Sequence, residues 1–260
     1  MKQLLEARKL QNEFSIDSND SITLHQNIIQ SNPILQGVYK KWYEEILPAV
    51  RDTEHLKLPM IELGCGASHI EKYIPGVIKS DVVAHSNVER VISCESLPFE
   101  KESLRALFLL GVIHHLEDPE KFLSEAERCL AKGGRLVFLE PTNSPLNQII
   151  VNRFSAYEKH DATVKSWKSD SAKGRLSNGN TALPWVIFIR DRNLLTQKFP
   201  RLRLKSIRYH TLLAYFISGG MAFKPFLPKP LAFLVRWIEF LTSPLHRLLG
   251  TEMTVDFEKI

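Results

Sequence analysis

The chain of 260 residues is long enough for one large domain, or for one domain that carries an insertion. Its 44% apolar and 24% charged residues are typical of a soluble globular protein. The first residues carry charges within their apolar part, which excludes a signal peptide, and no uncharged apolar run is long enough to predict a membrane span. Three scattered cysteines without zinc-ligand spacing favour a reduced, cytoplasmic setting.

The net charge of +5 is unevenly distributed along the chain. Residues 151–210 hold 13 Lys and Arg against 4 Asp and Glu, whereas the remainder is slightly acidic. A basic segment on an acidic body indicates either an anionic partner or an ordinary solvated surface. The sequence leaves both interpretations open.

Residues 1–55 are predicted to form an N-terminal helical cap, followed by the main domain at 56–260. Apolar residues recur near helical spacing between Ile28 and Leu47. Pro33, directly after Asn32, marks the start of the second of two helices. These helices are expected to pack on a sheet edge or to cover a binding site.

Residues 58–68 show the clearest local pattern. Met60–Leu63 is a short buried strand, and Gly64-Cys65-Gly66 follows at once. Glycines after a buried strand let the backbone turn tightly and approach a ligand, and a helix is expected to begin near Ser68 and to span 70–74. This layout is typical of a nucleotide-binding crevice in a parallel sheet. Glu62 would repel a diphosphate there, so it suits a ligand with a cationic amino group.

An acidic residue follows the second predicted strand, residues 77–80. Asp81, next to Val82, can bridge two ribose hydroxyls because a carboxylate accepts two hydrogen bonds at once. A helix N-cap or a turn is the structural alternative for this residue. A third strand is expected over 88–92, and it leads into Ser93-Cys94-Glu95-Ser96-Leu97-Pro98-Phe99.

The fourth predicted strand, Leu104–Leu110, is apolar except for Arg105 and runs into Gly111 and the pair His114-His115. Asp118 and Pro119 then start a helix as N-cap and first helical residue. Gly133-Gly134 are expected to close that helix, and 135–140 is the fifth strand.

These motifs, taken in order, resemble class I S-adenosylmethionine-dependent methyltransferases, in the small-molecule group (type 11) of the ubiquinone and menaquinone methyltransferases. Residues 62–66 resemble the family's Glu-x-Gly-x-Gly motif, and residues 93–99 resemble its Asp-Ala-x-x-Leu-Pro-Phe stretch. The chain departs from the family where Ser68 replaces a third glycine and where Ser93 replaces an acid. The resemblance implies an α/β, Rossmann-like sheet of seven strands flanked by helices, with an antiparallel last strand.

The resemblance also implies S-adenosyl-L-methionine as the cofactor. The residues expected to bind it are Glu62, Gly64, Cys65, Gly66, Asp81, Val82, Ser93, Cys94, Glu95 and Gly111. Either Ser93 or Glu95 would contact the adenine, and the sequence does not choose between them.

His114 and His115 are the candidate catalytic residues because they follow the fourth strand, beside the expected methyl donor. Either could act as general base for an oxygen acceptor, with His115 preferred, and a structural role for both is the alternative. The pair lacks the adjacent Glu of metal-assisted ubiquinone O-methyltransferases, and no other metal-ligand spacing occurs. No metal is therefore predicted.

Two insertions are expected in the main domain, at about 141–185 and at 212–249. The first contains a predicted mobile loop, Ser169–Thr181. The second contains an apolar helix before the last strand, with Phe233 and Trp237 on a wide apolar arc flanked by basic residues. Such a face could lie in a membrane interface, cover a lipid-like acceptor, or pack on the domain or on a second subunit.

The predicted function is methyl transfer, with O-methylation preferred, to a small anionic or amphipathic molecule such as a lipid-linked or phosphorylated sugar. The protein would be cytoplasmic, with contact to the inner membrane face and homo-oligomerisation left open, and DNA is not an expected partner. The rivals are a nicotinamide-dependent oxidoreductase, a non-catalytic interaction protein with the same fold, and an RNA methyltransferase. Glu62 and the altered glycine spacing argue against the first, and the lack of stacking aromatics argues against the last.

Overall fold

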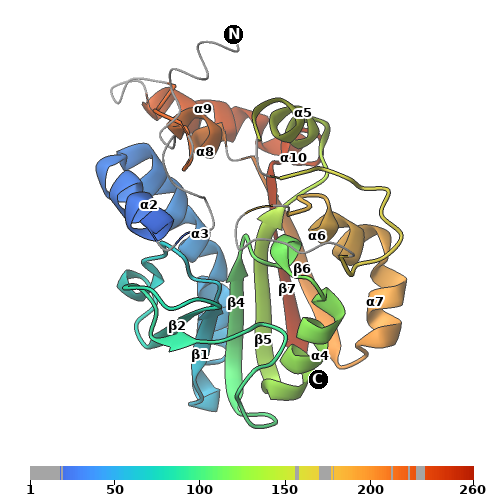
Figure 1. Ribbon diagram of the computed structural model, residues 1–260. Helices are drawn as coiled ribbons and strands as arrows, with labels where there is room; N and C mark the ends of the chain where they lie inside the picture. Colours follow the sequence, from blue (N-terminus) through green and yellow to red (C-terminus); the bar gives the residue numbers. More distant parts are fainter. Residues whose placement is uncertain are drawn as a thin grey trace.

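The computed structural model describes residues 18, 20–155, 158–169, 177, 179–211, 213–221, 223–226 and 232–260. Its centre is a seven-stranded sheet in the order β3-β2-β1-β4-β5-β7-β6 (Figure 1). The strands are β1 Met60–Leu63, β2 Val77–Asp81, β3 Arg90–Val91, β4 Leu104–Leu110, β5 Leu130–Pro141, β6 Leu202–His210 and β7 Glu252–Lys259. From β3 to β5 the neighbouring strands are parallel, and β7 is antiparallel to both β5 and β6. The predicted α/β sheet with its antiparallel last strand is confirmed.

The helices lie on both faces of this sheet and at one end of it. They are α2 Asp20–Ser31, α3 Pro33–Asp52, α4 Pro119–Cys129, α5 Pro145–Phe154, α6 Leu183–Trp185, α7 Arg192–Lys198, α8 Leu213–Ser218, α9 Ala232–Thr242 and α10 His246–Leu249. Shorter turns of 3-10 or π helix are η1 Glu54–Leu56, η2 Ile70–Lys72, η3 Ile113–His115, η4 Val186–Arg190 and η6 Ser243–Leu245. Within the described residues, no helix combines the length and the apolar character needed to cross a bilayer.

Helix α3 begins where the sequence predicts it. The side chain of Asn32 accepts hydrogen bonds from the backbone N–H groups of Ile34 and Leu35, and Pro33 occupies the first turn. Proline is tolerated there because that N–H has no intrahelical acceptor. Apolar residues then recur on one side of the helix, so that Tyr43 and Ile46 are fully buried.

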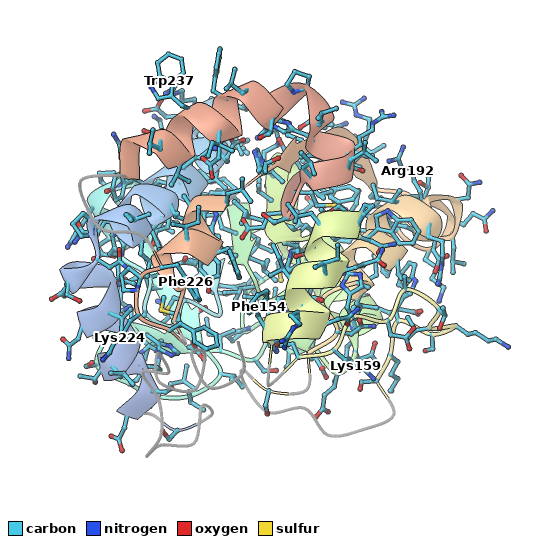
Figure 2. All side chains as sticks on the ribbon, turned by 90° about the horizontal axis from the view of Figure 1, so that it is seen from above. Phe154, Lys159, Arg192, Lys224, Phe226 and Trp237 are labelled. Atoms are coloured by element: carbon cyan, nitrogen blue, oxygen red, sulfur yellow. The ribbon has the colours of Figure 1, made fainter. Side chains whose placement is uncertain are left out.

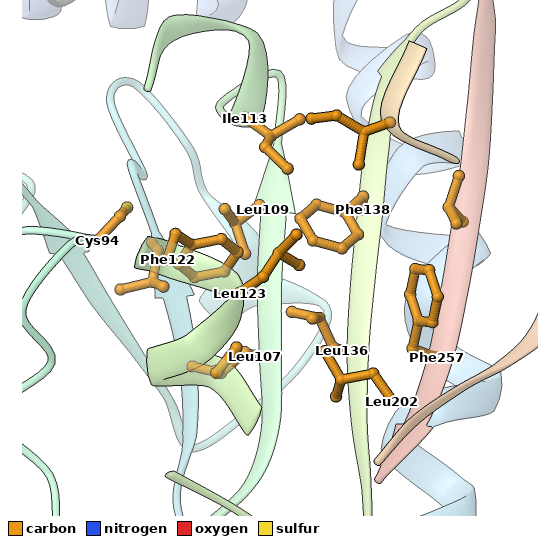
Figure 3. Close-up of a cluster of buried hydrophobic side chains, with 14 of the residues drawn as sticks. Cys94, Leu107, Leu109, Ile113, Phe122, Leu123, Leu136, Phe138, Leu202 and Phe257 are labelled. Atoms are coloured by element: carbon orange, nitrogen blue, oxygen red, sulfur yellow. The ribbon is translucent and has the colours of Figure 1, made fainter. Parts of the chain in front are cut away.

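The two faces of the sheet are covered by helices of different origin. On one face, Tyr43 and Ile46 of α3 share a buried cluster with Phe108 of β4. The other face packs on α4, α6 and α7 through a larger cluster that includes Phe122 and Phe138 (Figure 3). Helix α3 therefore supplies a large part of one layer of the core.

The segment between β1 and β2 differs from the prediction. The sequence predicts a helix from near Ser68 over 70–74, but the structure contains only the single turn η2. Ile70 and Ile74 are nevertheless buried in the cluster that α3 makes with the sheet. Pro75 and Gly76 follow directly, and Gly76 has a φ angle of 80°, so the chain turns into β2 after this single turn.

Two strand boundaries also differ. The strand β3 is shorter than the predicted 88–92, and β5 begins at Leu130 rather than at Arg135. The helix α4 accordingly ends at Cys129, so Gly133-Gly134 lie inside the strand instead of closing the helix. At its start the prediction holds, since Asp118 accepts a hydrogen bond from the N–H of Lys121.

The helices α2, α5, α8, α9 and α10 gather beyond the C-terminal ends of the parallel strands (Figure 1). The helix α9 lies within the second predicted insertion and exposes Trp237 (Figure 2). Phe240 and Leu241 of the same helix are also exposed. Some predictions fall outside the described residues: 1–17 of the N-terminal cap, 170–176 and 178 of the predicted mobile loop, and the side chain of Phe233.

Candidate active site

A cavity of about 930 Å³ opens at the end of the sheet where these helices gather. Residues that follow β1, β2, β4 and β5 form its floor, and α2, α3, α5 and α8 contribute to its walls. The predicted site residues that line it are Gly64, Cys65, Gly66, Asp81, Val82, Ser93, Cys94, Glu95, Gly111, His114 and His115. Segments far apart in the sequence thus meet at one cavity.

The glycine turn after β1 has the backbone that the sequence predicts. Gly64 and Gly66 have φ angles of 70° and 46°, a region that side chains other than glycine adopt at a cost. A Cβ on Gly64 would lie 2.7 Å from Cγ2 of Val112. The turn is held to β2 by the N–H of Cys65, which donates to the carbonyl of Ser80 at 2.8 Å.

Glu62 does not line the cavity, which corrects the expectation that its carboxylate faces a ligand across the turn. The residue is only 1% exposed within β1, and its Oε2 has no hydrogen-bond partner among the described atoms. Burial raises the pKa of Glu62 to about 8, against the smaller opposing effects of Ser68 and Lys79. The carboxyl group is therefore mostly neutral at pH 7.

Asp81 lies at the C-terminal end of β2 and faces the glycine turn. Its Oδ2 accepts a hydrogen bond from the N–H of Gly66 at 2.9 Å, and its Oδ1 lies 3.4 Å from the N of Val83. The ring of His85 lies 3.5 Å from Oδ2. Asp81 thus ties β2 to the turn after β1 while lining the cavity.

The two candidates for the adenine contact differ in their surroundings. Glu95 is engaged, because its Oε1 accepts a hydrogen bond from the N–H of Asp118 at 3.0 Å. Ser93 is exposed, and its Oγ accepts from the N–H of Glu95 at 3.3 Å. Between them Cys94 is buried, which raises the pKa of its thiol to about 12 and keeps it protonated.

His114 lies between two carboxylates, neither of which the sequence analysis identified. Glu140, at the end of β5, accepts hydrogen bonds from the N–H groups of Val112 and Ile113 through Oε1, at 2.7 and 2.8 Å. Its Oε2 lies 2.6 Å from Nδ1 of His114, and Oε1 of Glu158 lies 3.1 Å from Nε2. Burial alone would lower the pKa of His114, but the two carboxylates outweigh it and raise the pKa to about 9.

His115 has a different environment, although the two imidazole rings lie only 4.1 Å apart. Its Nε2 lies 3.3 Å from Oε1 of Glu158, and its buried Nδ1 has no hydrogen-bond partner among the described atoms. Burial and the charge of His114 lower the pKa of His115. For Glu158, burial opposes ionisation, but the two histidines lower the pKa of its carboxyl well below the usual range.

A short backbone ladder brings Glu158 to the histidines. The N–H of Lys159 donates to the carbonyl of Gly179, and the N–H of Thr181 donates to the carbonyl of Lys159, both at 3.0 Å. Asn180 in turn donates its N–H to the carbonyl of His114 at 3.1 Å. Gly179 approaches so closely that a Cβ there would lie 2.7 Å from Cε1 of His115.

The remaining wall of the cavity is aromatic. The ring of Phe216 lies 4.8 Å from that of Phe154 and 5.4 Å from that of Phe226, and Phe226 also meets Phe223. Figure 2 looks down on this end of the molecule, with Phe154 and Phe226 near its centre. Among the described lining residues there are carboxylates but no Lys or Arg.

Comparison with known proteins agrees with the fold and with the glycine turn after β1. Residues 61–138 match the model of the methyltransferase domain family. A structure assigned as a sarcosine dimethylglycine methyltransferase from Galdieria sulphuraria is 12% identical, covers 92% of this chain and 98% of its own, and has a TM-score of 0.51.

Two further structures are less similar. A geranyl diphosphate C-methyltransferase from Streptomyces coelicolor A3(2) is 14% identical, over 83% of this chain and 81% of its own, with a TM-score of 0.45. A SAM-dependent methyltransferase from Thermotoga maritima is 14% identical, over 90% of this chain and 99% of its own, with a TM-score of 0.46. No curated protein sequence matches the chain. Residues 61–138 therefore match a methyltransferase domain, and the chain has the fold of the class I S-adenosylmethionine-dependent methyltransferases.

Proposed function

We propose that this protein transfers a methyl group from S-adenosyl-L-methionine to a small-molecule acceptor. The observation that carries the proposal is the shared cavity, which joins the glycine turn, Asp81 and Ser93–Glu95 to the pair His114-His115. Its volume of about 930 Å³ is within the range of small-molecule sites. One end of the cavity therefore suits the cofactor, and the histidine end suits the acceptor.

The residues fit this cofactor. The turn at Gly64-Cys65-Gly66 presents backbone to the cavity, and a Cβ on Gly66 would meet open space, so nothing obstructs a close approach. The carboxylate of Asp81 can accept hydrogen bonds from hydroxyl groups, as it already accepts one from Gly66. Ser93 and Glu95 would border the adenine. When bound, the cofactor supplies an electrophilic methyl group on a sulfonium.

The chain's own catalytic contribution would be to hold the acceptor and to remove its proton. The lowered pKa of His115 keeps this imidazole neutral at pH 7, so it can accept a proton. His114 is fixed by Glu140 and by Glu158 and is the less available base. We therefore assign the proton-accepting role to His115 and a positioning role to His114, for an oxygen acceptor.

The aromatic wall favours an acceptor with an apolar body. Phe154, Phe216 and Phe226 offer stacking and dispersion contacts rather than charge. An anionic part of the acceptor has no Lys or Arg partner among the described lining residues. The proposed acceptor is thus amphipathic, with its apolar part against the phenylalanines and its reactive oxygen near His115.

The basic segment 151–210 gives little support to an RNA substrate. Several of its basic side chains lie within salt-bridge distance of carboxylates: Lys168 with Asp118, Arg190 with Asp191, Lys198 with Glu120, Arg203 with Glu258 and Arg208 with Glu45. These pairs draw part of the positive charge onto the protein itself. A solvated, paired surface explains the charge without a nucleic acid.

Calorimetry tests the cofactor directly. The purified protein is titrated with S-adenosyl-L-methionine, with S-adenosyl-L-homocysteine and with NAD. Binding of the first two and none of the third is expected. Binding of NAD alone would support the oxidoreductase, and binding of none would favour the non-catalytic interaction protein. Mass spectrometry of metabolites that co-purify with the protein would then identify the acceptor.

A further inference from the structure

We propose that His114, His115 and Glu158 form a binding site for one divalent transition-metal ion of the zinc or iron(II) class, although the sequence predicts no metal. The three side chains come from two segments of the chain, η3 and the stretch after α5, and all of them line the cavity. Only the role of the ion rests on the proposed function. With the ion bound, His115 is a ligand and cannot also accept a proton, so the ion would hold and activate the acceptor oxygen in place of that imidazole. The site itself rests on the arrangement of these side chains.

The first argument is geometric. Oε1 of Glu158 lies 3.1 Å from Nε2 of His114 and 3.3 Å from Nε2 of His115, and the three ligand-type atoms lie within 4.8 Å of one another. In a tetrahedral site with bonds of about 2.0–2.1 Å, neighbouring ligand atoms are about 3.3 Å apart. An ion could therefore bind between these atoms with only a small adjustment of the side chains.

The second argument is the support behind the ligands. Glu140 accepts hydrogen bonds from Val112 and Ile113 through one oxygen, so its other oxygen is fixed at 2.6 Å from Nδ1 of His114. A carboxylate that holds one ring nitrogen sets the tautomer in which the other nitrogen presents its lone pair to a metal. In many zinc sites a carboxylate holds a histidine that binds the ion, and this raises the basicity of the histidine ligand.

The third argument is charge. Glu140 and Glu158 bring two carboxylates to a place where the side chain of Glu140 is fully buried. With both imidazoles neutral, as metal ligation requires, the site carries two negative charges that a divalent ion would balance. Without an ion the protonated His114 balances one of these charges, so the ion would bind with release of a proton from His114.

The donor set indicates the class of ion. Two imidazoles and one carboxylate are the ligands of catalytic zinc sites and of the iron(II) facial triad, both of which keep coordination positions open. Calcium and magnesium prefer oxygen donors. Since all three ligands line the cavity, the open positions would face the space proposed for the acceptor.

Metal titration of the purified protein tests the site. After treatment with a chelator, the protein is titrated with Zn²⁺ by calorimetry and with Co²⁺ by visible absorption, without cofactor or acceptor. One ion per chain is expected, with a d–d spectrum of low coordination number for Co²⁺. Glu158→Gln, which keeps the shape of the side chain, and His115→Ala should each weaken binding at least tenfold, and Glu140→Gln about 10–100-fold, the usual effect of a supporting residue.

His160→Ala is the matched control. This histidine lies two residues after Glu158, but both of its ring nitrogens are already engaged, by Thr181 and by Asn143, at 2.9 Å. The His160→Ala variant should bind Zn²⁺ as tightly as the wild-type protein does. Circular dichroism confirms that each variant folds, and Glu158→Gln decides the matter if His115→Ala does not.

The proposal is overturned if the wild-type protein binds no Zn²⁺ or Co²⁺, or if Glu158→Gln binds them as tightly as the wild type. The same samples are titrated with S-adenosyl-L-methionine. Cofactor binding without metal binding would remove the metal site alone. Metal binding without cofactor binding would remove the proposed function and leave the metal site standing.

Discussion

The hydroxyl of Tyr43 lies 3.0 Å from Oγ of Ser68, which joins the middle of α3 to the turn after β1. The same tyrosine oxygen accepts a hydrogen bond from the N–H of His69 at 3.0 Å, and Ser68 Oγ accepts from the N–H of Ile70 at 3.2 Å. Ser68 stands where the methyltransferase motif has a third glycine. Here a hydroxyl at that position connects the cofactor turn to the N-terminal helix.

Removing this connection should lower stability. Tyr43→Phe keeps the ring in its buried cluster but leaves the N–H of His69 without its acceptor and removes one of the contacts of the Ser68 hydroxyl, which costs about 1–3 kcal/mol. Urea unfolding should report this loss. Tyr73→Phe is the control, because Tyr73 is only partly buried and packs beside the same cluster. Equal stabilities of the wild type and Tyr43→Phe would show that the contact contributes nothing.

Asp81 should contribute to cofactor affinity in two ways. Its carboxylate can accept hydrogen bonds from hydroxyl groups of the cofactor, and it accepts one from the N–H of Gly66, which fixes the glycine turn. Asp81→Ala loses both and should weaken binding by about 1–3 kcal/mol, the scale of hydrogen bonds to a charged group. Asp81→Asn keeps an acceptor for Gly66 and should lose less. Calorimetry measures both, and unchanged affinity in Asp81→Ala would remove Asp81 from the site.

The histidine pair should affect turnover and not cofactor affinity. His115→Ala should reduce turnover about 10²–10⁴-fold, the usual contribution of a positioned acid or base. His114→Ala should also reduce it, because Glu140 would lose the side chain that it positions. His160→Ala should retain activity. Full activity of both single variants would leave the orientation of the acceptor as the main catalytic device.

Glu62 should make stability depend on pH. Its pKa is raised by burial to about 8 in the folded protein, from an ordinary value of 4.5. Between these values the folded state holds more protons than the unfolded state, so stability falls as pH rises from about 4.5 to 8. Glu62→Gln should flatten this part of the profile and should be the more stable protein above pH 8. Thermal unfolding of the wild type and of Glu62→Gln between pH 5 and 9 measures this pH dependence of stability.

Glu44→Gln is the matched control for that experiment. Glu44 lies on α3 with an exposed side chain, paired only with Lys40 among the described residues. Its substitution should leave the pH profile of stability unchanged. If Glu62→Gln and Glu44→Gln behave alike, the buried carboxyl of Glu62 is not the group that titrates.

The outer face of α9 should mediate association. Trp237, Phe240 and Leu241 are 62%, 70% and 69% exposed, which is unusual for such large apolar side chains on adjacent turns. We expect the protein to co-sediment with anionic liposomes, and Trp237→Ser with Phe240→Ser to reduce this without loss of cofactor binding. Leu194→Ser, at an exposed leucine on α7, is the control. A dimer in light scattering that these substitutions dissociate would show instead that the face binds a second copy.

The positions of β1, β2 and β4 along the chain and the glycine turn could be predicted from the sequence, because each depends on residues close together in the chain. The helix predicted after Ser68 is reduced to the turn η2, and its isoleucines share the cluster that α3 makes with the sheet, a contact between distant segments that the local pattern does not show. Glu158 could not be predicted as a neighbour of His114, since a backbone ladder to Asn180 brings it there. Glu140 could have been found from the sequence, because it is an acidic residue at the end of the buried strand β5, next to the strand β4 that leads to the histidines.

The position of β7 between β5 and β6 has a consequence for folding order. β6 pairs with β7 alone among the described strands, so its backbone hydrogen bonds form only once residues 252–259 are available. Until then β5 is an open sheet edge, the kind of surface that pairs with other chains. During synthesis, the partly made protein must therefore keep this edge from aggregating while α8, α9 and α10 are still being added.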